Sequence, residues 1–182
     1  MRKYLVLIFL ALNSAFASAA ELTLFDIPLR TSSREEIRDA ITQAGGKLKN
    51  SSRDSDKYDA RAIGMPGATE LEVVYLEDKL VMAQYSITVD IKEEERIRKM
   101  LVAKYGQPQG RDDFDGQYIS DGKYRWNFDH SMELVFTKDF FSSAPKFLSY
   151  VNKREVARLG KLVNDADRRA AEKDAAKKKS VF

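Results

Sequence analysis

The residues best suited to catalysis cluster around the single histidine, because the chain has one His and no Cys. His130 follows Asp129 and precedes Ser131. An acid, a histidine and a serine that are adjacent in an extended segment cannot form a triad, since consecutive side chains point to opposite faces. We therefore expect a turn histidine with local hydrogen bonds. A transition-metal site would need mostly carboxylate ligands, a poor donor set for such metals, so the sequence predicts neither a metal site nor a cofactor.

The second candidate site is an acidic segment at residues 111–122. Aligned with the twelve-residue calcium loop, it places Arg111 at the first ligand position and Gly122 at the twelfth, where the loop requires carboxylates. We interpret the segment as a solvated loop, with calcium binding as the alternative. Its carboxylates are also candidates for contact with a basic partner, which needs no fixed spacing. These carboxylates belong to Asp112, Asp113 and Asp115.

Three aromatic residues form the third candidate. Tyr124, Trp126 and Phe128 alternate with polar residues, so a strand would place their rings on one sheet face. That face is either part of the core, covered by a helix, or an exposed contact patch of the kind enriched at protein interfaces. The chain has no glycine-rich phosphate loop and no Gly-x-Ser-x-Gly motif. We expect a protein that is not an enzyme.

The C-terminal segment, residues 153–182, is predicted to be a basic amphipathic helix and tail. Residues 153–179 contain ten basic and five acidic side chains, and apolar residues recur at helical spacing from Val156 to Ala166. We expect its first half to dock on the sheet and its second half to protrude. It is either a solvated helix end or a contact for an anionic surface. The candidate contacts are Arg168, Arg169, Lys173, Lys177, Lys178 and Lys179.

Two helices of similar design are expected to position these residues. The first begins after the N-cap candidates Ser32 and Ser33 and ends at Gly45-Gly46. The second begins at residues 93–95 and ends before Gly106, and the apolar residues of the two helices match at an offset of sixty. This similarity suggests a repeated unit.

Strands follow each helix in the same order. Residues 58–63, 70–76 and 80–89 are expected to be extended in the first half, and 123–128, 131–137 and 147–151 in the second. We match Leu71–Tyr75 with Met132–Phe136. The sequence thus predicts an α+β fold: a tandem α-β-β-β repeat with antiparallel sheets, helices on one face and a charged C-terminal helix. The predicted units are 21–91 and 92–152.

The strands of the first half have apolar residues on both faces. Leu71, Val73 and Tyr75 share one face, whereas Val74 and Leu76 point the other way. A helix covers only one face of a sheet. We therefore expect the second face to be covered by the other repeat, by the C-terminal helix or by an external partner.

The first twenty residues have the pattern of a secretory signal. Arg2 and Lys3 precede an apolar run and then small residues, with cleavage expected near Ala19 or Ala20. The expected mature protein is periplasmic or secreted. Because it lacks cysteine, we do not expect a lipoprotein. Its charge is divided between acidic residues in 21–152 and the basic tail, which excludes a uniformly basic nucleic-acid binder.

Some of these segments resemble a known group of proteins. The lead Leu24-Phe25-Asp26-Ile27-Pro28-Leu29, the helix end Lys104-Tyr105-Gly106-Gln107-Pro108 and the strands after each helix resemble small bacterial envelope proteins of the outer-membrane assembly lipoprotein/β-lactamase-inhibitor-protein type. The resemblance covers about 21–152. In that group a helical element packs on a three- or four-stranded antiparallel sheet, and the inhibitors carry the unit twice. The chain lacks the lipidated cysteine of the first type and the disulfides of the second.

The resemblance implies a role in binding other proteins without chemistry of its own. We therefore expect a non-catalytic exported protein-binding module of the bacterial cell envelope. Two alternatives remain: a secreted inhibitor of a hydrolase, and an adaptor to an anionic surface, such as a membrane, through the basic C-terminal helix.

Overall fold

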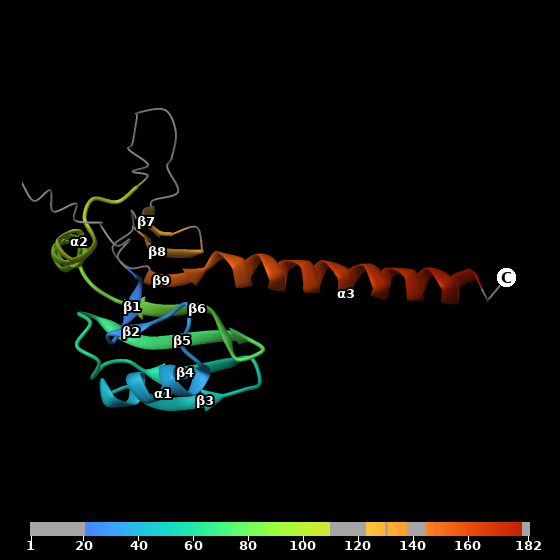
Figure 1. The fold of residues 1–182 in the computed structure, drawn as a ribbon, viewed down its shortest axis with the longest axis horizontal. Coiled ribbons are helices and arrows are strands. Elements are labelled where there is room, and N and C mark those ends of the chain that lie inside the picture. Colours follow the sequence, from blue (N-terminus) through green and yellow to red (C-terminus); the bar gives the residue numbers. More distant parts are fainter. Residues whose placement is uncertain (1–20, 110–122, 130, 138–144, 180–182) are drawn as a thin grey trace, which may run out of the picture.

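The computed structural model describes residues 21–109, 123–129, 131–137 and 145–179, with side chains up to Lys173 (Figure 1). Its helices are α1 (Arg34–Gln43), α2 (Ile91–Tyr105) and α3 (Lys153–Lys179). Its strands are β1 (Thr23–Leu24), β2 (Ile27–Pro28), β3 (Lys47–Ser51), β4 (Ser55–Asp59), β5 (Ala68–Leu76), β6 (Lys79–Ile87), β7 (Lys123–Phe128), β8 (Met132–Thr137) and β9 (Lys146–Asn152). The predicted signal segment, residues 1–20, lies outside the described residues.

The strands β3 to β9 form one seven-stranded antiparallel sheet in the order β3-β4-β5-β6-β9-β8-β7. The two halves of the chain meet in the middle of this sheet, where β6 pairs with β9 and Gln84 lies opposite Ser149. Each half supplies a helix followed by antiparallel strands. The predicted α+β class, with antiparallel pairing and a C-terminal helix, is confirmed.

The two repeat helices begin with N-caps. In α1, Ser33 and Glu36 form a capping box, in which each side chain accepts a hydrogen bond from the other residue's backbone N–H. In α2 the Asp90 side chain accepts from the N–H of Glu93. Ile37 and Ile97, which the offset of sixty matches, are both fully buried. The equivalence of the two helices therefore extends to their packing.

Both helices pack on the same face of the sheet. The buried residues of α1 and α2 belong to one hydrophobic core, together with alternate residues of the central strands. Tyr85 and Tyr150 meet edge to face within this core, with ring centroids 6.5 Å apart, where the halves join. The register places Leu71 beside Tyr85 and Leu134 beside Tyr150. If the two tyrosines are taken as equivalent, Leu71 matches Leu134 rather than Met132.

Three features of the fold differ from the sequence expectation. The strand expected at 58–63 lies earlier, as β4 (Ser55–Asp59), and residues 60–63 lie outside it. The first half has an additional edge strand, β3, whose five residues are all exposed and which carries a bulge after Leu48. The lead segment also forms a short hairpin of β1 and β2, in which Phe25 and Asp26 have positive φ angles of 51° and 65°. Positive φ at both central residues is the geometry of a tight type I′ turn.

The C-terminal helix leaves the sheet at the end of β9 and projects away from the rest of the protein (Figure 1). Its first turns contact β6, β8 and β9. Arg158 forms an ion pair with Glu77 in the turn between β5 and β6. Across the described ranges, none of the helices combines the length and apolar content needed to cross a membrane.

Candidate partner-binding surface

The sheet face opposite α1 and α2 is a candidate partner-binding surface, and we call it the open face. The two repeats lie side by side in one sheet, so neither covers this face of the other. Helix α3 runs outward from the end of β9 (Figure 1). The open face consists of residues that alternate with the core residues of β4 to β9: Lys57, Glu70, Glu72, Val74, Met82, Gln84, Arg125, Glu133, Val135, Phe147, Ser149 and Val151. Two of them, Val135 and Ser149, are buried, and the others are half-buried.

The centre of the open face is apolar. Val74 lies beside Met82, and Met82 lies beside Val151, so three apolar side chains form a row across β5, β6 and β9. All three are half-buried. In the next row, Gln84 Nε2 donates a hydrogen bond of 2.9 Å to Ser149 Oγ. The centre therefore offers apolar area without an unpaired amide.

Charged pairs flank this centre on both sides. On β4 and β5, Lys57 Nζ lies 3.4 Å from Glu72 Oε1 and 3.8 Å from Glu70 Oε1. On β7 and β8, Arg125 Nη1 lies 3.6 Å from Glu133 Oε1. An apolar centre with a charged, partly solvated rim is the composition of a protein interface.

The predicted exposed aromatic patch is wrong for Trp126 and Phe128. Trp126 is 2% exposed and Phe128 8% exposed, and both belong to the hydrophobic core. Tyr124 is half-buried and packs on the same core. The indole Nε1 of Trp126 donates a hydrogen bond of 2.8 Å to the carbonyl oxygen of Gly106. The rings therefore serve as the core face beneath α2, the other interpretation of the alternation.

Other predicted sites lie wholly or partly outside the described residues. Asp112, Asp113 and Asp115 of the acidic segment lie outside them, as does His130. The side chains of Lys177, Lys178 and Lys179 also lie outside. Arg168, Arg169 and Lys173 are exposed on α3, and Arg168 Nη2 lies 3.1 Å from Asp165 Oδ1.

A buried carboxylate joins α1 to the sheet. Asp56 on β4 is fully buried and accepts two hydrogen bonds from Arg38, of 2.7 and 2.8 Å, and two from Arg34, of 2.8 and 3.1 Å. Ser51 Oγ donates another, of 2.8 Å. Burial alone raises the pKa of the Asp56 carboxyl, but these hydrogen bonds outweigh burial and hold the pKa well below its usual range.

A second buried ion pair joins α2 to the sheet. Lys146 Nζ on β9 lies 3.3 Å from Glu94 Oε2 on α2, and the two residues are 0% and 7% exposed. The ammonium makes no hydrogen bond of acceptable geometry with the described residues. At the offset of sixty, Glu94 matches Arg34. Equivalent positions of the two helices therefore carry opposite charges, and each pairs with a strand residue of the other sign, Asp56 for Arg34 and Lys146 for Glu94. Both pairs lie beneath helices, which makes them structural.

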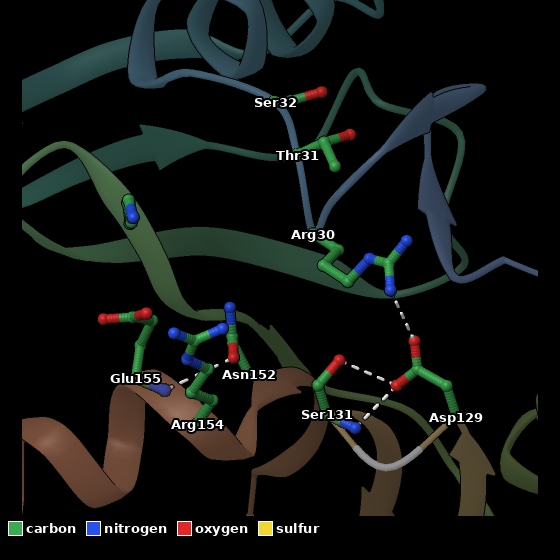
Figure 2. A pocket seen from close by; sticks show the side chains of 9 residues that line it. Arg30, Thr31, Ser32, Asp129, Ser131, Asn152, Arg154 and Glu155 are labelled. Carbon is green, nitrogen blue, oxygen red and sulfur yellow. Dashed lines mark hydrogen bonds and ion pairs between the residues drawn. The ribbon is translucent and has the colours of Figure 1, made fainter.

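A cavity of about 540 Å³ lies where the lead segment, the β7–β8 turn and the start of α3 meet (Figure 2). In this view Arg30 reaches Asp129, with Nη1 3.3 Å from Oδ2. Asp129 Oδ1 accepts from the backbone N–H and the Oγ of Ser131, which define the turn. The Asn152 side chain accepts from the N–H of Glu155 at the start of α3.

The polar contacts in this cavity fix a turn and a helix end. Hydrogen bonds from Ser131 lower the pKa of Asp129, so this carboxylate is ionised at neutral pH and holds no proton to donate. No set of three or more potential metal ligands comes together in the described parts of the chain. The arrangement therefore supports structural roles at the junction of the two halves.

The sequence contained only a partial signal for these contacts. Arg34 and Arg38 are four residues apart on one helix face, which is the spacing of side chains that share a partner. Nothing local indicates that this partner is Asp56. The open face was visible as apolar residues on both sides of the predicted strands, but its flanking ion pairs depend on the register between strands.

Comparison of the chain with models of protein families, with curated proteins and with solved structures finds no significant match.

Proposed function

We propose that this protein is a non-catalytic, exported protein-binding module of the bacterial cell envelope, which contacts its partner through the open face. One observation carries the proposal: both repeat helices pack on the same side of a seven-stranded sheet, and neither of them covers the other side. A single-sided sheet normally exposes polar residues on its solvated face. Here Val74, Met82 and Val151 form an apolar row at its centre.

The pattern of this face indicates the chemistry of the partner. A protein surface with an apolar centre would bury the row of Val74, Met82 and Val151. Charged side chains around the partner's apolar centre would contact the charged pairs of the open face. These pairs are Lys57 with Glu70 and Glu72 on one side, and Arg125 with Glu133 on the other. Each flank of the open face carries both positive and negative side chains. Long-range electrostatic attraction of the partner therefore contributes little, and shape complementarity at the apolar centre determines specificity.

Export and the envelope location are proposed from the sequence. The support is the charged, apolar and small-residue order of residues 1–20. The resemblance to assembly lipoproteins and inhibitor proteins supports protein binding. The adaptor function remains the second candidate, because Arg168, Arg169 and Lys173 are exposed on the projecting helix.

The test is capture of a partner from envelope extracts with the purified chain as bait. Met82→Asp places a charge at the centre of the open face, and Met100→Asp makes the same change at a 43% exposed position on α2. The proposal expects wild type and Met100→Asp to capture the same partner and Met82→Asp to lose it. Circular dichroism and thermal unfolding check that both variants fold.

Two results would overturn the proposal. One is equal capture by Met82→Asp and wild type, which would place the contact elsewhere on the molecule. The other is the absence of any specific partner together with a hydrolytic activity of the purified chain. For the adaptor candidate, the expected result is binding to anionic vesicles that weakens as salt is raised, with zwitterionic vesicles as the control.

A further inference from the structure

Helix α3 carries an apolar stripe that the rest of the described chain leaves uncovered. Val156, Val163, Leu159 and the alanines beyond them recur at alternating spacings of three and four residues, which is the heptad pattern of a coiled coil. Val156 is 43% and Val163 50% exposed, whereas Leu159 is half-buried. The stripe consists of Val156, Leu159, Val163, Ala166 and Ala170.

We propose that α3 pairs with α3 of a second copy of this chain, in antiparallel orientation, through this stripe. The inference goes beyond the proposed function and does not rest on it. A two-fold symmetric interface requires a surface that is complementary to itself. The stripe meets this requirement because its large residues lie in the first half of the helix and its small residues in the second.

The sizes of the side chains favour the antiparallel orientation. Reversing one helix places Leu159 opposite Ala170 of the second copy, and Val163 opposite Ala166 of the second copy. Each layer then joins a large side chain to a small one, so the distance between helix axes stays constant along the contact. In a parallel pair, Val163 would meet Val163 and Ala170 would meet Ala170, and the layers would differ in width.

Charge favours the same orientation. Lys173 occupies the next position of the heptad after Ala170. A parallel pair in register would bring two Lys173 ammonium groups together in the seam, where like charges repel. In the antiparallel pair Lys173 lies opposite Val156 of the second copy. The aliphatic part of Lys173 then covers the valine while its ammonium stays in water.

Gly160 supplies an independent observation. It lies inside the helix, where glycine is unfavourable relative to alanine. A Cβ added at Gly160 would meet no atom within 4 Å, so the fold of the chain itself does not require a glycine there. Gly160 borders the stripe, beside Val156 and Val163. The backbone of a second helix can approach closely at a residue without a side chain.

A second helix fits this surface better than a membrane does. The stripe has the spacing of a coiled-coil seam, and Leu162, which is 48% exposed, borders it at a flanking position. Acidic residues also follow it closely: Asp165 and Asp167 are exposed or half-exposed on the same part of α3. They offset part of the basic charge of α3 that would attract anionic lipid.

The first experiment measures the mass of the purified full chain by analytical ultracentrifugation over a range of concentrations. Wild type is expected to shift from one chain toward two. Val163→Glu should weaken the dimer by at least about tenfold, because it places a charge in the seam. Asn164→Glu is the matched control, since it adds the same charge at the neighbouring exposed position, off the stripe, and it should dimerise like wild type.

The second experiment tests orientation by cross-linking, which is simple because the chain has no cysteine. Leu159→Cys and Ala170→Cys chains are oxidised separately and as a mixture. The antiparallel pair predicts disulfide-linked dimers in the mixture and few in either variant alone. A parallel pair would link Ala170→Cys chains to one another.

Three results would overturn the inference. The first is a monomer at every concentration, and the second is a dimer that Val163→Glu leaves intact. The third is a monomer that binds phosphatidylglycerol vesicles and loses this binding in Val163→Glu, which would assign the stripe to a membrane. Cross-linking of Ala170→Cys alone would overturn the antiparallel orientation.

Discussion

Arg34 donates two hydrogen bonds to the carboxylate of Asp56, from Nε to Oδ2 at 3.1 Å and from Nη2 to Oδ1 at 2.8 Å. The two residues are 22 positions apart in the sequence. The same guanidinium donates to the carbonyl oxygens of Ser52 and Arg53, and it lies 4.7 Å from the centroid of the Tyr75 ring. A single side chain thus joins α1 to the β3–β4 turn and to β5. Its partner Asp56 is the point at which a change should affect the first half most.

The stability of the protein should depend on pH through Asp56. Its folded-state pKa is lowered, whereas in the unfolded chain it is about 3.9. Below that value the unfolded state binds more protons than the folded state, so the free energy of unfolding falls as pH is lowered toward the folded-state pKa. Urea unfolding at a series of pH values between neutral and strongly acid should show this loss.

Asp56→Asn isolates that contribution. The variant should be less stable at neutral pH by about 3 kcal/mol, because two guanidinium groups lose their counter-charge. Its stability should fall less steeply than that of wild type below about pH 4. Glu36, Asp59, Glu77 and Asp129 also have lowered pKa values and contribute equally to both proteins. Parallel curves for the two proteins would contradict the assignment.

The buried pair of Glu94 and Lys146 predicts strong coupling between two substitutions. Glu94→Gln should lower the free energy of unfolding by about 3–5 kcal/mol, because it leaves an uncompensated ammonium in the core. Replacing both residues, as Glu94→Leu with Lys146→Met, should recover most of this loss. A double-mutant cycle of Glu94→Leu, Lys146→Met and the double variant, measured by denaturant unfolding, checks the prediction. Additive losses would show that the two charges do not depend on each other.

Trp126 is the only tryptophan and should report on the core beneath α2. Its native fluorescence should lie at shorter wavelength than that of the unfolded chain, and acrylamide should quench it poorly. Trp126→Ala should cost about 3–5 kcal/mol of stability, and Trp126→Phe less, because phenylalanine keeps most of the apolar volume. Emission at long wavelength from the native protein would contradict the burial of the indole.

Much of the fold could be predicted because it depends on local periodicity. Ile37 and Ile97 mark the buried faces of the two helices, and the alternation from Tyr124 to Phe128 marks a strand. The period of a strand does not say which face is buried, so the aromatic patch had two interpretations until the position of α2 decided between them. Strand β3 gave no signal, because its sequence Lys-Leu-Lys-Asn-Ser is polar and suits an exposed edge.

The site-level contacts were harder to predict. The pairs of Arg34 with Asp56 and of Glu94 with Lys146 join residues 22 and 52 positions apart, and they depend on strand order and register. Lys146 looks like any surface lysine in the sequence. Its burial follows from the side of β9 that it occupies, opposite Ile87 of β6.

Gly160→Ala should have opposite effects on the stability of α3 in the monomer and on the pairing of two α3 helices. Alanine should stabilise the helix by about 0.5–1 kcal/mol, because glycine loses more backbone freedom on folding. Hydrogen exchange at concentrations where the chain is monomeric should therefore be slower in the variant. At high concentration the same substitution should weaken dimerisation. Faster exchange in the monomer would show that the glycine relieves strain within the chain itself.

The lead segment has a consequence for the order of folding. Leu22, Leu24 and Leu29 are buried in the common core, and Arg30 reaches Asp129, 99 residues further along the chain. A ribosome completes these residues before it makes the second half, which supplies part of their surroundings. The central pairing of β6 with β9 must also wait for the second half. The chain therefore has to keep its early apolar segment out of wrong contacts until synthesis has passed β9, and folding of this many distant contacts is expected to be slow.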